Sequence, residues 1–211
     1  MNFKELSFSQ ALYDTNVIIY YCSHFSEELM GEKIDLCIIE TERAHELTKE
    51  LLELDKTIIT LNLILDEIEN KGIAKFIDDF CDKPEIMDKL GTDTIPDRLR
   101  QKFAEKMERK LRKLRANDWF DVVEYMPSLS CISILKQFYL SLDGTPIMME
   151  HFHRKGNYNP IPSCQDRALL CYSSEFDVLL VSNDSDITDF ITELKREGHC
   201  FEIFDLNECN V

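Results

Sequence analysis

Two apolar, strand-like runs in this chain end directly on acidic residues. Residues 11–13 are followed by Asp14, and residues 178–181 lead into Ser-Asn-Asp-Ser-Asp, which places Asp184 and Asp186 just after the second run. Short apolar runs bounded by polar residues are typical of buried strands. Open α/β sheets bind ligands at the carboxyl ends of their strands, so two acids that meet there require a cation.

The remaining pattern alternates between strand and helix. We predict strands at 10–14, 57–61, 121–126, 178–182 and 200–204, and helices at 16–25, 33–54, 64–72 (ending at its glycine or continuing through residue 80), 97–115, 129–142, 165–176 and 187–197. Residues 82–95 read as a loop or broken helix and 143–163 as a long loop. This alternation predicts an α/β fold with a mainly parallel sheet covered on both faces. No repeat or linker divides the chain, which favours one domain over 1–211 with an insertion at about 75–160 that contains a basic helix (97–115).

Composition indicates a soluble, globular protein. Hydrophobic residues make up 44% of the 211 residues and charged residues 30%. The start of the chain, residues 1–6, lacks the apolar region of a signal peptide, and no apolar run is long enough for a membrane span, so we expect a cytoplasmic protein without a membrane partner. The eight cysteines form no CxxC or CxxH pair and are expected to be reduced thiols in the core, in preference to a zinc site.

The net charge of −16 argues against a polyanionic partner unless the positive charge is concentrated. It is concentrated in the 97–115 helix, where basic residues form a stripe beside the apolar one: Arg98, Lys102, Lys106, Arg109 and Lys113. We interpret this stripe as a nucleic-acid-binding surface, with a solvated helix face as the alternative. The segment 151–158 mixes aromatic residues with Arg154 and Lys155, which could grip phosphates and stack bases, or could form an ordinary surface loop whose histidines are solvated.

Four short segments, taken in order, resemble the PIN-domain nucleases. They are Tyr13-Asp14-Thr15-Asn16, Leu65-Asp66-Glu67-Ile68, Gln165-Asp166-Arg167-Ala168 and Val181-Ser182-Asn183-Asp184-Ser185-Asp186. The resemblance implies a three-layer α/β/α sandwich with a central, mainly parallel sheet. It also implies a cluster of acids that binds Mg²⁺ or Mn²⁺ and a metal-dependent hydrolysis of RNA, often single-stranded. The basic insertion has no counterpart in small members of that family.

The resemblance and the strand ends together assign the candidate site. Asp14, Asp166 and Asp184 are expected to bind the metal, and Glu67 and Asp186 to complete its shell or orient water. Asn16 and Ser182 are expected to orient the carboxylates. Each residue has an ordinary alternative: Asp14 as a turn or helix cap, Glu67 as a solvated position in competition with Asp66 and Glu69, Asp166 in the first turn of a helix, and Asp186 with Asp189 at a helix start.

The sequence therefore predicts a divalent-metal-dependent nuclease, in particular an endoribonuclease acting on single-stranded or structured RNA. The alternative is an inactive PIN-like scaffold that binds a protein or RNA partner. A different Mg²⁺-dependent phosphohydrolase is disfavoured, because the chain has no Gly-rich phosphate loop and no DxDx(T/V) motif after the first strand. Other nucleic acids as substrate, an inhibitory or regulatory protein partner and a homo-oligomer remain open.

Overall fold

Five parallel strands form the central sheet of the protein in this computed structural model, which describes residues 7–29, 31–156 and 158–209. The strands lie in the order β5-β4-β1-β6-β7. Their bounds are β1 (Gln10–Tyr13), β4 (Thr57–Leu61), β5 (Phe120–Val123), β6 (Leu179–Ser182) and β7 (Glu202–Asp205). Leu12 of β1 pairs with Ile59 on one side and Leu180 on the other, and all three are fully buried, as expected for a parallel sheet covered on both faces.

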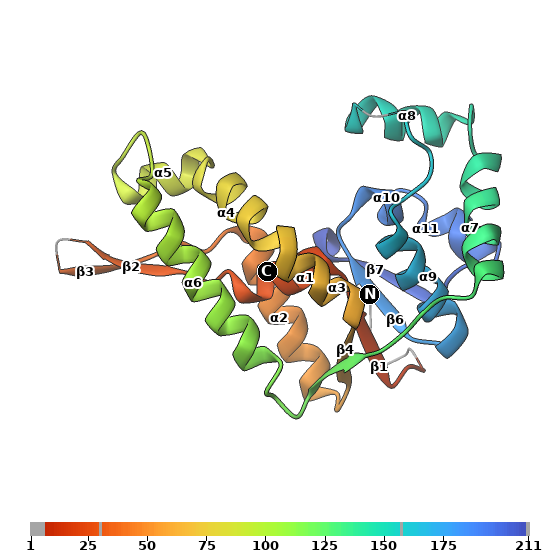
Figure 1. The fold of residues 1–211 in the computed structure, drawn as a ribbon, viewed down its shortest axis with the longest axis horizontal. Coiled ribbons are helices and arrows are strands. Elements are labelled where there is room, and N and C mark those ends of the chain that lie inside the picture. The colour runs from red at the N-terminus through yellow and green to blue at the C-terminus, as the bar shows by residue number, and fades with distance from the viewer. Residues whose placement is uncertain (1–6, 30, 157, 210–211) are drawn as a thin grey trace.

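Helices cover both faces of this sheet, which confirms the predicted three-layer α/β/α fold. In Figure 1, α1 (Thr15–Cys22), α2 (Ile39–Glu53) and α3 (Asn62–Glu67) lie on one side of the strands. On the other side lie α7 (Leu129–Ser141), α9 (Cys164–Phe176) and α11 (Ile191–Arg196). The helix predicted at 187–197 is divided, because α10 (Ser185–Thr188) precedes α11.

The chain reverses its direction across the sheet between β1 and β6. From β1 it proceeds to β4 and β5 on one side, whereas from β6 it proceeds to β7 on the other. In an open α/β sheet such a reversal leaves a crevice beyond the strand ends, where ligands bind. The backbone N–H of Asp14 donates to the carbonyl of Val181 at 3.2 Å, so the ends of β1 and β6 are held side by side.

The segment predicted as an insertion packs against the core and also contributes to the sheet. After α3, a π-helical turn η2 (Ile68–Gly72) continues into α4 (Ile73–Cys81), so the predicted helix does carry on beyond its glycine. The basic helix α6 (Asp97–Leu114) packs on α4, and the ring of its Phe103 stacks on Phe25 at 5.0 Å. The edge strand β5 follows α6 and lies within 75–160.

The predicted helix at 33–54 is wrong over its first residues. An antiparallel hairpin of β2 (Ser26–Leu29) and β3 (Glu32–Asp35) precedes α2, which begins only at Ile39. Gly31 has a φ of 85°, a left-handed conformation that glycine adopts without strain and that a tight hairpin turn requires. The apolar residues recur at helical spacing only after position 36, and the predicted helix starts too early, within this hairpin.

Helices lie in both segments with loop signals, which agrees with the broken helix considered for 82–95 but not with the long loop predicted at 143–163. Residues 82–95 include α5 (Pro84–Leu90), and residues 143–163 include α8 (Pro146–Lys155). Each helix has proline at its first position and ends at a glycine with positive φ, Gly91 and Gly156. The prolines and glycines, which the sequence reads as signs of a loop or a broken helix, therefore mark helix starts and ends at both places. Asn157, within the predicted loop, lies outside the described residues.

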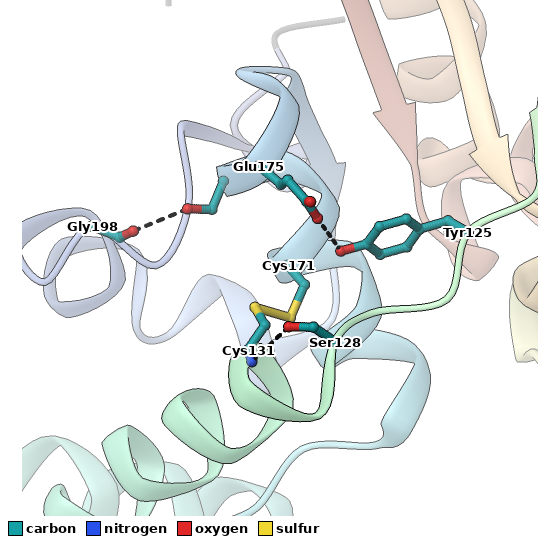
Figure 2. The surroundings of a disulfide bond; sticks show 7 residues. Tyr125, Ser128, Cys131, Cys171, Glu175 and Gly198 are labelled. Atoms are coloured by element: carbon teal, nitrogen blue, oxygen red, sulfur yellow. Dashed lines mark hydrogen bonds between the residues drawn. A yellow bond between two sulfur atoms is a disulfide. The ribbon is translucent and has the colours of Figure 1, made fainter.

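The expectation that every cysteine is a reduced thiol is also wrong for one pair. Cys131 of α7 and Cys171 of α9 form a disulfide with a Cα–Cα distance of 6.2 Å (Figure 2). The two residues are 40 positions apart, so their spacing gave no sign that the packing of α7 on α9 brings them together. The free cysteines are Cys22, Cys37, Cys81, Cys164, Cys200 and Cys209.

Over the described residues, no helix combines the length and the apolar character needed to cross a membrane. Residues 1–6, on which the signal-peptide expectation rests, lie outside the described part of the chain.

Candidate metal centre

Asp14 lies at the end of β1 and is almost completely buried, with 3% of its surface exposed. Its carboxylate caps α1 by accepting a hydrogen bond from the N–H of Val17 at 2.9 Å, and it accepts a second from the hydroxyl of Ser182. Burial raises the pKa of Asp14 to about 7, although these two hydrogen bonds oppose the shift. The ionised form of Asp14 is therefore costly in this pocket, and a nearby cation would lower that cost.

Asp184 follows β6, and Ser182 connects it to Asp14. The Ser182 hydroxyl donates to Asp14 and accepts from the backbone N–H of Asp184 at 3.0 Å. Asp184 caps α10, because its carboxylate accepts from the N–H of Asp186 at 2.8 Å. A helix start was the alternative considered for Asp186, but the structure gives the capping role to Asp184. The carboxylate of Asp186 instead faces His151 and Lys155.

Asp166 lies in the first turn of α9 and forms a capping box with Ser163. The Ser163 N–H donates to the Asp166 carboxylate at 3.0 Å, and the Asp166 N–H donates to the Ser163 hydroxyl at 3.1 Å. Burial, and then the negative charge of Asp184, raise the pKa of Asp166 to about 6. The capping role expected as its alternative is thus present, and it holds the carboxylate beside another acid.

Three carboxylates converge at this point. One oxygen from each of Asp166, Asp184 and Asp186 lies within 4.8 Å of the others. Together with Asp14 they line a cavity of about 460 Å³. Carboxylate oxygens at this spacing are the ligands that Mg²⁺ and Mn²⁺ prefer, and their mutual repulsion is relieved when a cation binds. The residues present therefore fit a hard divalent ion.

Glu67 and Asn16 also line the same cavity. The Thr15 hydroxyl donates to the Glu67 carboxylate at 2.7 Å and fixes its orientation. The competing Glu69 binds Arg115 at 2.7 Å. The structure thus brings all five predicted acids to one cavity, although Glu67 is not among the three that converge.

Basic side chains from α8 lie against the converging acids and the neighbouring Asp189. Lys155 binds the carboxylate of Asp186 and lies 4.0 Å from that of Asp184. His151 is 2% exposed, contrary to the expectation of a solvated histidine, and its Nε2 lies 3.1 Å from Asp186 Oδ1. Arg154 donates to Asp189 at 2.7 Å. Arg154 and Lys155, predicted to bind nucleic acid, are therefore bound to carboxylates of this chain.

The residues of the predicted basic stripe on α6 do not share one role: two of them bind the β2–β3 hairpin, and the others do not. Lys102 and Lys106 each donate to Glu27 at 2.7 Å and hold the β2–β3 hairpin against α6. Arg98 and Lys113 are exposed and have no ion-pair partner within the described residues, and Arg109 donates to the backbone of its own helix. The hairpin is not predicted from the sequence, so the pairing of two of these lysines with it could not be predicted either.

Sequence reasoning missed three lysines that line the acidic cavity: Lys71, Lys75 and Lys83. Lys71 and Lys75 are exposed and make no ion pair with any other described residue. The signal was present, because residues 67, 71 and 75 recur at a spacing of four, which places Glu67 and both lysines on one face of the helix.

Comparison with known proteins leaves the family of this chain open. No protein-family model and no curated protein matches it. Among solved structures, a chain from the crystal structure of VapBC2 from Rickettsia felis bound to a DNA fragment from their promoter aligns with 93% of this chain. The alignment covers 98% of that chain, with 12% sequence identity and a TM-score of 0.41. A likeness at this level leaves function to be argued from the site.

Proposed function

We propose that this protein is a PIN-like, divalent-metal-dependent nuclease that hydrolyses phosphodiester bonds of RNA. The observation that carries the proposal is the convergence of Asp166, Asp184 and Asp186, beside Asp14, in the crevice where the sheet reverses its direction. Mg²⁺ or Mn²⁺ held by these acids would supply an activated water and stabilise charge on the phosphate.

Other residues in and around the cavity have supporting roles. Ser182 fixes Asp14 and Asp184 relative to one another through its two hydrogen bonds. Glu67, oriented by the Thr15 hydroxyl, presents a carboxylate that can accept a proton of the attacking water. Lys71 and Lys75 supply unpaired positive charge beside the acids, where the phosphate backbone must approach.

A second candidate function is the inactive scaffold, and one observation favours it. Lys155 binds Asp186 and so already neutralises part of the charge that a metal would satisfy. A scaffold of this kind would bind RNA or a protein partner without cleaving it. A regulatory protein partner and a homo-oligomer stay predictions under either function.

Metal dependence of cleavage tests the proposal directly. Purified protein incubated with end-labelled single-stranded RNA should cut it in Mn²⁺ and should stop when EDTA is added, because carboxylates alone do not activate water sufficiently. Excess Mn²⁺ should restore cutting. Cleavage of hairpin RNA and of single-stranded DNA of the same sequence is compared with it to identify the preferred substrate. Cleavage that persists in EDTA contradicts the mechanism, and tight RNA binding without cleavage supports the scaffold.

The two exposed lysines of the cavity are expected to bind the substrate backbone. The double variant Lys71→Ala/Lys75→Ala should bind RNA more weakly, and the slope of log affinity against log salt should decrease by about 1.4, or about 0.7 for each lost phosphate contact with a single strand. Fluorescence anisotropy over a salt series measures both quantities, on an Asp166→Asn background that keeps the RNA intact.

A matched control for this prediction comes from α6. The variant Arg98→Ala/Lys113→Ala removes the same charge from exposed positions that lie outside the cavity lining. Its salt slope should stay close to that of the parent protein. If the α6 variant lost the affinity and the cavity variant kept it, the basic helix would be the nucleic-acid-binding surface, as the sequence had predicted.

A further inference from the structure

A second group of possible metal ligands lies at the base of the β2–β3 hairpin. His24 precedes β2, Asp35 is the last residue of β3, and Cys37 lies between β3 and α2. One ligand atom from each lies within 4.8 Å of the others, and His24 Nε2 is 3.4 Å from Asp35 Oδ2. None of the three lines the acidic cavity.

The backbone that carries these side chains is anchored by its neighbours. Phe25 and Leu36 are buried in the core next to the three ligands, and the Leu36 N–H donates to the Phe25 carbonyl at 3.0 Å. The Cys37 N–H donates to Asp35 at 3.1 Å. Lys110 donates to the carbonyl of His24, and Lys89 donates to that of Cys37 at 3.1 Å. The backbone on both sides of the site is therefore positioned before an ion binds, which lowers the ordering cost of binding it.

We propose that His24, Asp35 and Cys37 form a binding site for a thiophilic divalent ion of the Zn²⁺ class. The set offers one imidazole nitrogen, one carboxylate oxygen and one sulfur, which suits Zn²⁺ or Co²⁺ and excludes a preference for Mg²⁺. Two ligand atoms that each lie about 2.1 Å from a tetrahedral ion are about 3.4 Å apart. The separation of His24 Nε2 from Asp35 Oδ2 already matches that geometry.

The third ligand is the sulfur of Cys37, and the fourth coordination position is left for a ligand from solvent. Burial and the hydrogen bond to Asp35 raise the pKa of the Cys37 thiol to about 12, whereas the charge of Lys110 opposes this shift. The ion must therefore displace the thiol proton to solvent as the metal–sulfur bond forms. The side chains of His24 and Asp35 are 45% and 64% exposed, so the fourth position faces solvent and takes water or an external ligand.

Titration of the full-length protein with Co²⁺ tests this site. The protein is first stripped of metal with EDTA, dialysed, and kept without reductant under anaerobic conditions. Co²⁺ should produce a thiolate-to-cobalt charge-transfer band in the near ultraviolet, and Zn²⁺ should displace the Co²⁺ and remove the band. Cys37→Ser should abolish the band, and His24→Ala should weaken Co²⁺ binding at least ~10-fold.

Two control variants make the result specific. Cys164→Ser removes an exposed thiol at the start of α9 and should keep the band. Asp186→Asn alters the acidic cavity and should also keep it, because carboxylate-bound Co²⁺ gives no thiolate band. Circular dichroism confirms that each variant is folded. Absence of the band at saturating Co²⁺, or its persistence in folded Cys37→Ser, would overturn the proposal whether or not the protein is a nuclease.

Discussion

Asp166→Asn is expected to lower the Mn²⁺-dependent rate of RNA cleavage at least ~1,000-fold. Asp166 contributes one of the three converging carboxylates, and substitution with the neutral amide removes a ligand charge while it preserves the size of the side chain. A catalytic metal stabilises the transition state by several kcal/mol, and each ~1.4 kcal/mol corresponds to a factor of ten in rate. Single-turnover cleavage of labelled RNA at saturating Mn²⁺ measures the effect.

The opposite end of the same helix offers a matched control. Asp177 is exposed at the carboxyl end of α9 with a φ of 53°, a conformation that asparagine tolerates well. Asp177→Asn makes the same chemical change and should leave the rate unaltered. Because Asp166 also caps its helix, Asp186→Asn serves as a second test and should cause a similar loss. Full activity in either folded cavity variant would contradict the assigned metal site.

Phe103→Ala is expected to lower the free energy of unfolding by about 3–5 kcal/mol. The Phe103 ring is fully buried, stacks on Phe25 at 5.0 Å and meets Phe80 edge-on at 5.8 Å. These rings come from the basic helix, from the segment after α1 and from α4. Removing Phe103 leaves a cavity where the predicted insertion meets the core of the domain.

Urea unfolding followed by circular dichroism and by fluorescence of the single tryptophan, Trp119, measures this loss and tests the predicted single domain. Both signals should report one transition that shifts to lower urea in the variant. Leu99→Ala, on the same apolar stripe but only partly buried, should shift it less. Two transitions, with only one displaced by Phe103→Ala, would show that the basic insertion folds as a separate domain.

Local sequence patterns predicted the strands of the sheet and the acids that follow its two central strands, because both depend on residues that are close together in the chain. The apolar runs that precede Asp14 and Asp184 are fully buried strands, and helical spacing predicted most, but not all, of the helices between them. The acids at the strand ends could be named because a parallel sheet brings its carboxyl ends to one edge.

The partners of charged side chains could not be predicted in this way. Glu27 forms ion pairs with two lysines of the basic helix, and Asp186 forms one with Lys155. These partners are far apart in the chain, so no local sequence pattern encodes the contacts. The disulfide between Cys131 and Cys171 could not be predicted for the same reason. Predicting which cations remain available to a phosphate therefore requires the tertiary structure, because sequence composition counts charges without showing which of them are paired.

The register in which Tyr13 pairs with Val181 sets how the carboxylates that follow the two strands lie relative to one another. A slip of one residue in this register would move Asp14 about 3.3 Å along the strand and turn the buried side chains of β1 toward the opposite face. The hydrogen bond from Ser182 to Asp14 would then be lost, and the acids would no longer share a pocket. The proposed activity therefore depends on correct strand alignment, and a chain trapped in a misaligned sheet would lack the assembled metal centre.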